Sequence, residues 1–302
     1  MANLKAIRTR IKSVQATKKI TSAMKLVAAA KVRRAQHRTL AARPFSERVI
    51  RMLREIVRET QAIDLAEMPL LMHRPVKKVE LIIIGSDRGL CGSYNSTVFR
   101  AALERIKQLQ AEGKQVSITC IGLKAVAFFR GIRGFDGKPI EKHTPYTLLP
   151  AVPTLEEAKL IAQNAEKLFV SGEVDAIELI STHFISMLRS EVRTLKFLPV
   201  EMPEAAQDET PGVPDPLLIF DPSIPEVLAD QLLPKYVENT IFQALLEATA
   251  AELAARMNAM SNASTNASEL ITSLTLVYNK ARQAAITQEL LEVVGGAEAL
   301  RG

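Results

Sequence analysis

The chain has 302 residues, 47% of them hydrophobic, which is enough to bury one large domain or two modest ones. No run approaches the roughly 18 apolar residues of a membrane span. Two cysteines without metal-ligand spacing argue against a disulfide framework or a zinc site, and the lack of Trp weakens any case for stacking on nucleic-acid bases.

The net charge of +6 hides a strong asymmetry along the chain. Residues 1–58 hold sixteen Lys or Arg and only two acidic residues, Glu47 and Glu55, for a net charge of +14, so the remainder carries −8. Such a basic segment indicates an acidic partner surface, which is nucleic acid, anionic lipid or acidic protein.

The first predicted element is a long helix with a narrow apolar seam. Small or apolar residues recur at steps of three, four or seven, at Leu4, Ile7, Ile11, Val14, Thr21, Met24, Ala28 and Ala35. Pro44 is expected to bend or locally break the helix, and the period resumes at Phe45, Val49, Leu53 and Ile56. A cleaved targeting peptide is the alternative, but such a peptide would not need an apolar face that persists past residue 50.

A second kind of pattern follows a Pro-marked linker. Buried strands are predicted at 79–85, 116–122, 176–184 and 192–202, with an edge strand at 217–220. Helices are predicted from the loop 86–92 to about 111, then at 124–130 and 155–170, and 131–153 reads as irregular. Strands that alternate with helices predict a mostly parallel sheet covered on both faces, a Rossmann-like α/β domain.

The last predicted element is a second long helix. It is expected to begin at the capping box Ser223–Glu226, with Pro234 as a kink, and residues 236–294 contain no Gly or Pro. A seven-residue repeat runs from Ala250 to Ala285, which predicts a left-handed coiled coil. Residues 261–268 have the composition of a loop, so two shorter helices are the alternative, but the register is the same on both sides.

The predicted fold is therefore a long antiparallel two-helix coiled coil, formed by the N- and C-terminal helices, plus a central Rossmann-like α/β domain. The expected domains are 1–75, an N-terminal coiled-coil helix and linker, 76–222, the α/β domain, and 223–302, the C-terminal coiled-coil helix.

Candidate chemistry centres on the loop 86–92, which lies at a strand-to-helix turn. The loop lacks both glycine-rich phosphate-binding patterns. Cys91 could act as a nucleophile with His143 or His183 as its base, but packing of a small residue in a tight turn is favoured. His37 and His73 have no ligand pattern around them. We expect no catalytic, cofactor-binding or metal-binding residues, and no cofactor.

Three separated motifs span essentially the full length of the chain. They are Thr17–Gln36 in the first helix, Ser86–Asn95 in the central loop, and Tyr278–Glu289 with Glu292, Gly296 and Ala297 near the end. Together they resemble the gamma subunit of F-type ATP synthases. The resemblance implies a non-catalytic central rotor shaft that couples proton-driven rotation of a membrane c-ring to ATP synthesis at the catalytic beta subunits. It implies alpha, beta and epsilon subunits and the c-ring as partners, and no nucleic acid.

The resemblance also implies a role for four residues. Arg282 and Gln283 match the pair that contacts a catch loop of a beta subunit, and Met24 and Lys25 fall where the first helix faces an acidic beta loop. Thiol-regulated chloroplast members carry an inserted cysteine pair, whereas Met202–Leu217 is short and has no cysteine, so redox switching is not expected. The expected location is peripheral, on the cytoplasmic face of a bacterial cell membrane, or a thylakoid membrane in a photosynthetic source.

Two alternatives from other classes remain open at this stage. A basic coiled-coil scaffold that binds nucleic acid through residues 1–58 would show steeply salt-dependent DNA binding. A cysteine hydrolase that uses Cys91 would lose its turnover to thiol reagents.

Overall fold

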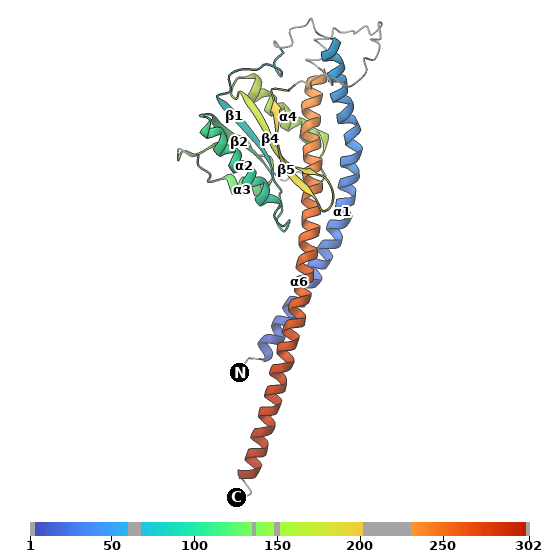
Figure 1. The fold of residues 1–302 in the computed structure, drawn as a ribbon, viewed down its shortest axis with the longest axis vertical. Helices are drawn as coiled ribbons and strands as arrows, with labels where there is room; N and C mark the ends of the chain where they lie inside the picture. Colours follow the sequence, from blue (N-terminus) through green and yellow to red (C-terminus); the bar gives the residue numbers. More distant parts are fainter. Residues whose placement is uncertain (1–3, 60–67, 135–136, 148–151, 202–230, 300–302) are drawn as a thin grey trace. The chain divides into compact units, whose positions relative to one another are not determined.

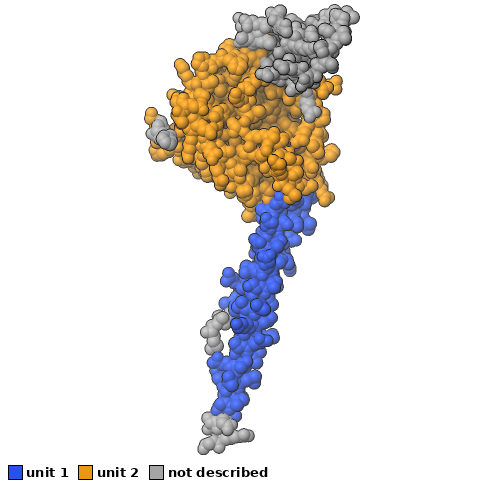
Figure 2. All heavy atoms as spheres, in the orientation of Figure 1, with its two compact units in different colours: residues 1–30, 256–302 blue, residues 31–255 orange. Residues whose placement is uncertain are grey.

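A computed structural model describes residues 4–59, 68–134, 137–147, 152–201 and 231–299 of the chain. They fall into two compact units, residues 1–30 with 256–302 and residues 31–255 (Figure 2). In chain order the elements are α1 Leu4–Glu59, β1 Lys78–Ile84, α2 Tyr94–Ala111, β2 Gln115–Ile121, α3 Leu123–Phe129, β3 Glu141–Lys142, α4 Leu155–Val170, β4 Ala176–Phe184, β5 Ser190–Leu198 and α6 Leu233–Ala299.

The unit of residues 31–255 contains a five-stranded sheet of order β3-β2-β1-β4-β5 (Figure 1). The pairs β1–β2, β1–β4 and β2–β3 are parallel, and β5 runs antiparallel to β4. This confirms the predicted Rossmann-like α/β fold. The strand β3 is a correction, because it lies within the stretch 131–153 that the sequence analysis expected to be irregular.

Both faces of the sheet are covered, as predicted. Val79, Leu81 and Ile83 of β1 pack with α2 and α3, whereas Ile82 and Ile84 pack with α4 and with parts of α1 and α6. The tight turn after β2 needs a glycine. Gly122 has φ +95°, and a Cβ atom there would lie 2.7 Å from the carbonyl oxygen of Gly85.

The two long helices lie antiparallel within this unit. Val32 of α1 packs in one cluster with Ala250 and Ala254 of α6, while Ser46, further along α1, accepts a hydrogen bond from Asn239, earlier in α6 (2.7 Å). Apolar burial and polar pairing thus hold α1 and α6 against the α/β domain.

The unit of residues 1–30 and 256–302 is a two-helix rod. The ends of α1 and α6 lie side by side and run in opposite directions (Figure 1). Thr21, Ala28, Met260 and Ala267 are buried. The remaining predicted seam residues of this unit are half-buried, and they are Leu4, Ile7, Ile11, Val14, Met24, Met257, Ser264, Ile271, Leu274, Tyr278, Ala281 and Ala285. The seven-residue prediction is confirmed.

Residues 261–268 are helical, so α6 is continuous through the stretch with loop composition. Its hydroxyl groups bond back to the helix itself, as Thr265 Oγ1 does to the carbonyl of Ser261 (3.2 Å) and Ser268 Oγ to that of Ser264 (3.0 Å). Such local bonds satisfy Ser and Thr inside a helix. The alternative of two shorter helices is therefore wrong.

Three other expectations need comment. α1 continues through Pro44, and Phe45 is 56% exposed, because Ser46 and not Phe45 takes the inward position there. Pro234 lies in the first turn of α6, where a missing N–H costs little. The predicted edge strand 217–220, the capping box at Ser223 and the boundary at 222 lie outside the described residues. The bounds of the three expected domains stay a prediction.

Within the described ranges, none of the helices combines the length and the apolarity that crossing a membrane requires.

Candidate functional site

The four residues predicted to contact a partner all lie in the two-helix rod. Met24 is a half-buried residue of the seam, and Lys25, Arg282 and Gln283 are exposed. The main-chain carbonyl of Gln283 accepts a hydrogen bond from the hydroxyl group of Thr287 (3.0 Å). The structure thus brings these residues into one unit on two different helices.

The basic character of the rod is concentrated on α1. All seven Lys and Arg residues between positions 4 and 30 are exposed, and this range contains no Asp or Glu. A surface of one sign attracts a partner of the opposite sign. The positive charge inferred from the sequence is therefore available on the outside of the rod.

The last turns of α6 combine this polar surface with exposed apolar side chains. Ile286 is 47% exposed, Leu290 61%, Leu291 67% and Val293 70%. Exposed apolar residues that gather in one place usually mark a contact with another protein. The end of α6 has the surface of a segment that another chain covers.

The loop 86–92 is held together by its own polar groups. The side chain of Asn95 accepts from the main-chain N–H of Ser86 (3.1 Å) and its Nδ2 donates to the Sγ atom of Cys91 (3.3 Å). Ser86 Oγ donates to the carbonyl of Arg88 (2.7 Å). These bonds close a tight turn, and the side-chain donors of Ser86 and Asn95 are used within it.

The surroundings of Cys91 also test the alternative of a cysteine hydrolase. Cys91 is 2% exposed and packs with Val32, Tyr94 and Phe184. The two histidines proposed as its base each contact a carboxylate instead, His143 that of Glu80 and His183 that of Glu247. The buried position of the Cys91 thiol therefore agrees with the interpretation that this residue packs in a tight turn.

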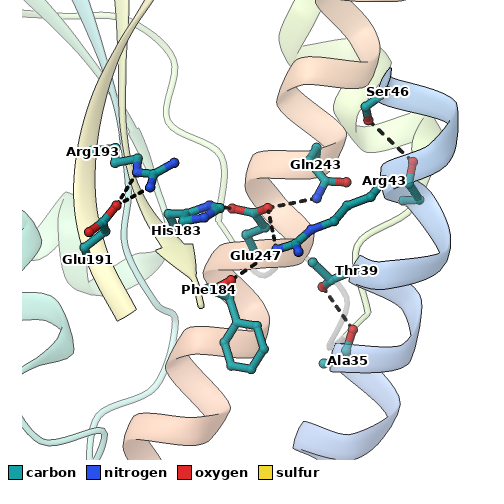
Figure 3. A network of polar contacts seen from close by, with 11 residues as sticks. Ala35, Thr39, Arg43, Ser46, His183, Phe184, Glu191, Arg193, Gln243 and Glu247 are labelled. Carbon is teal, nitrogen blue, oxygen red and sulfur yellow. Dashed lines mark hydrogen bonds and ion pairs between the residues drawn. The ribbon is translucent and has the colours of Figure 1, made fainter. Parts of the chain in front are cut away.

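A polar network joins the central sheet to both long helices (Figure 3). At its centre is Glu247 of α6, which is 8% exposed. Its carboxylate accepts hydrogen bonds from Nδ1 of His183 in β4 and from Nε2 of Gln243 (2.9 Å), and it forms an ion pair with Arg43 of α1 (3.7 Å). One carboxylate thus contacts groups from three separate elements.

Arg43 makes the second connection in this network. Its Nη2 atom donates to the carbonyl oxygen of Phe184, at the end of β4, over 3.2 Å (Figure 3). One turn further along α1, Ser46 is bonded to Asn239 of α6. The end of β4 and the two helices are held by charge-assisted bonds in addition to apolar contacts, which favours movement of this unit as a rigid body.

This network was not predicted from the sequence, although one signal was present. Glu247 is the only charged residue between positions 239 and 251, where α6 is otherwise uncharged. A lone carboxylate among small and apolar helix residues requires a partner when it is buried. The partner could not be identified, because Arg43 and His183 are far away in the chain.

Comparison with known proteins gives a consistent result. The family model described as ATP synthase matches residues 3–300. The ATP synthase gamma chain of Nostoc punctiforme is 48% identical over 324 aligned residues, covering 99% of this chain and all of the relative. The gamma chain of Thermosynechococcus vestitus is 47% identical and is covered completely, as is this chain.

Solved structures with the same fold come from mitochondrial ATP synthases. A chain of the Euglena gracilis enzyme, from a structure of its OSCP, F1 and c-ring assembly, has a TM-score of 0.65 at 17% identity and covers 98% of this chain and 94% of its own. A chain from the central stalk and c-ring structure of Tetrahymena thermophila has a TM-score of 0.57 at 23% identity, covering 81% of this chain and 99% of its own. These two likenesses concern the fold.

Proposed function

The chain belongs to the ATP synthase gamma chain family. Because of this membership, we propose that it acts as the non-catalytic central rotor shaft of an ATP synthase complex. Proton flow turns the membrane c-ring, the ring turns the shaft, and the shaft changes the conformation of the catalytic beta subunits. Because the chain belongs to this family, we no longer interpret it as a nucleic-acid-binding scaffold or as a cysteine hydrolase.

The observation that carries this proposal is the two-helix rod with an exposed basic helix and an exposed apolar end. A shaft must be stiff along its axis and must offer a surface to the subunits around it. The buried seam at Ala28, Met260 and Ala267 supplies the stiffness, and the exposed end of α6 at Leu290 and Leu291 supplies the surface.

The partners that follow are the alpha and beta subunits around the rod, and the epsilon subunit and c-ring beside the α/β domain. The solved relatives that share the fold come from structures described as central stalk, rotor and c-ring assemblies. The chain is thus peripheral to the membrane and is held there by the complex. Its location is the cytoplasmic face of a bacterial membrane, either the cell membrane or a thylakoid, and the cyanobacterial relatives support both membranes.

At the rod, Arg282 and Gln283 contact one beta loop, and Met24 and Lys25 face another. Arg282 is exposed and can direct its planar guanidinium at a carboxylate on the partner. Lys25 belongs to the exposed basic surface of α1 and suits an acidic loop. A few such bonds bias a beta subunit between conformations without fixing the shaft.

Thiol accessibility tests the proposal in an assembled complex. Gln283→Cys and Leu291→Cys are made in the full chain, whose native Cys91 and Cys120 are both buried. We expect fast maleimide labelling of the free chain and strong protection after assembly with alpha and beta subunits. Glu104→Cys, at an exposed position of α2, is the matched control and should react equally in both states. Equal reactivity of Gln283→Cys in both states contradicts the proposal.

A further inference from the structure

A fully buried carboxylate lies in the middle of the central sheet. Glu80 of β1 is 0% exposed, and it shares the sheet face of Ile82 that α4 covers. It accepts hydrogen bonds from the hydroxyl groups of Ser117 and Thr119 on the neighbouring strand β2, the latter over 2.6 Å. A buried carboxylate kept in this way has a structural or functional reason, because its desolvation is costly.

The third partner of Glu80 is a histidine that faces outward to two further carboxylates. His143 directs Nδ1 to Glu80 Oε2 (3.0 Å) and Nε2 to Glu173 Oε1 (3.2 Å), with Glu141 Oε1 at 3.9 Å. One ligand atom each from Glu141, His143 and Glu173 can be chosen so that all lie within 4.8 Å of one another. They come from β3 and the segments that follow β3 and α4, so the topology of the sheet brings them together.

The charges of this cluster do not balance. It holds the carboxylates of Glu80, Glu141 and Glu173, and the described cation in contact with them, other than His143 itself, is Lys78, 2.8 Å from Glu141. With a neutral imidazole the cluster carries a charge of −2. A bound divalent cation balances this charge.

We propose that Glu141, His143 and Glu173 form a binding site for a zinc ion, in which Glu80 orients the ligating histidine. Histidine ligands of zinc commonly donate their other ring N–H to a carboxylate, which fixes the tautomer and leaves the free nitrogen for the metal. Glu80 stands in that relation to His143, since it holds Nδ1 and leaves Nε2 directed at the two exposed carboxylates.

The two separations measured from His143 Nε2 suit a tetrahedral ion. With metal–ligand bonds of about 2.0–2.2 Å, tetrahedral ligand atoms lie about 3.4 Å apart. The separations of 3.2 and 3.9 Å around His143 Nε2 bracket this value. Glu141 has the largest adjustment to make, because it must turn away from Lys78, and its side chain is 54% exposed and free to do so.

The choice of zinc follows from the donor set. An imidazole with two carboxylates suits zinc and related transition metals, whereas magnesium and calcium favour oxygen ligands alone. A cavity of about 430 Å³, lined by residues that include Glu80, Thr119, His143 and Glu173, adjoins the cluster and gives an ion access from solvent.

The test is equilibrium dialysis of the purified full chain against zinc chloride, with bound metal measured by mass spectrometry. We expect saturable binding of one zinc per chain, and no comparable binding of magnesium or calcium. Glu173→Gln and His143→Gln should abolish saturable binding, while Glu141→Gln should weaken it least. Glu104→Gln, an exposed carboxylate of α2 outside the cluster, is the matched control and should bind as wild type does.

Two further measurements separate a metal site from a structural ion-pair cluster. Glu80→Gln keeps hydrogen-bond acceptors but removes the orienting charge, and it should weaken zinc binding by about ten- to a hundredfold. Cobalt in place of zinc should give the visible absorption of a tetrahedral site, and this spectrum should be lost in Glu173→Gln, whose exposed position does not threaten folding. Absence of saturable zinc binding, or binding unchanged in both Glu173→Gln and His143→Gln, overturns the proposal.

Discussion

The guanidinium of Arg43 in α1 donates a hydrogen bond to the main-chain carbonyl of Phe184 at the end of β4, over 3.2 Å. The same guanidinium is 3.7 Å from the carboxylate of Glu247 in α6. A single side chain thus contacts the end of β4 and the second long helix at once. A rotor subunit needs such connections, because torque on the domain reaches the long helices through the contacts between them.

Glu247→Ala should lower the free energy of unfolding by about 2–3 kcal/mol, because His183 and Gln243 lose a buried, charged acceptor. Arg43→Ala should cost less, about 1 kcal/mol, since its side chain is 37% exposed. Urea unfolding of the full chain measures both, and the double variant tests their coupling. Glu104→Ala is the control. A wild-type midpoint for Glu247→Ala contradicts the importance of the network.

Arg282→Ala should assemble normally and lower steady-state ATP hydrolysis by about ten- to a hundredfold, the equivalent of a charge-assisted bond of about 1.5–3 kcal/mol. Gln283→Ala, which loses a neutral bond, should do less. Lys280→Ala removes a positive charge from another exposed position of the same helix and serves as the matched control. Hydrolysis by purified complexes, with a thermal melt beside it, is the measurement. Arg282→Ala complexes that turn over at the wild-type rate would show that the contact is misassigned.

Cys91→Ser should leave ATP synthesis near the wild-type rate. The residue is buried, and the new hydroxyl group can accept the bond that Asn95 now donates to sulfur (3.3 Å). We expect a loss of stability on the order of 1 kcal/mol from burial of a more polar group. Synthesis by reconstituted complexes checks the first statement and thermal unfolding the second. Fully assembled complexes without activity would favour a chemical role for the thiol.

Glu166 of α4 should make the chain less stable as the pH rises. Burial, and then the charge of Glu238, raise the pKa of its carboxyl group from 4.5 to about 7. The folded state therefore holds a proton that the unfolded state has released, and stability falls between about pH 4.5 and pH 7. Glu166→Gln should melt at a higher temperature than wild type at pH 8 and at a similar temperature at pH 4.

His143 also makes the chain less stable as the pH rises, but over a higher pH range, because its pKa is raised as well. The stability that His143 contributes is fully present below the pKa of the unfolded state, about 6.5. It is lost as the pH rises through the pKa of the folded state. The comparison of Glu166→Gln with wild type removes this contribution, since both proteins contain His143. A melting difference that is the same at pH 4 and pH 8 would contradict the assignment to Glu166.

The sequence predicted best those features that depend on local periodicity. The repeat through Met260 and Ala267 identified the seam, and the apolar run at 79–85 identified the central strand. Each pattern repeats over many residues, so single exceptions do not hide it. By contrast, Phe45 was predicted on the apolar face of α1, and this prediction is wrong. Its hydrophobicity alone suggested that the apolar repeat restarts directly after Pro44.

The features that the sequence could not predict depend on distant pairing. β3 is the polar pair Glu141–Lys142, and it becomes a strand only because Ser117 and Ile118 offer a free edge. The contact between Glu80 and His143 requires the parallel strands β1, β2 and β3 to lie in register, which no local pattern encodes. The contacts of Glu247 with Arg43 and His183 are of the same kind.

The rod joins the two ends of the chain, and this has a consequence for biosynthesis. The seam residue Ala28 leaves the ribosome more than 200 residues before its partner segment around Met260. At a synthesis rate of about 5–20 residues per second, the apolar stripe of α1 waits on the order of ten seconds or longer for its cover. During this interval the nascent helix is a hydrophobic, strongly basic segment without a partner. The arrangement that gives a finished shaft its stiffness therefore makes the unfinished chain a natural client for chaperones.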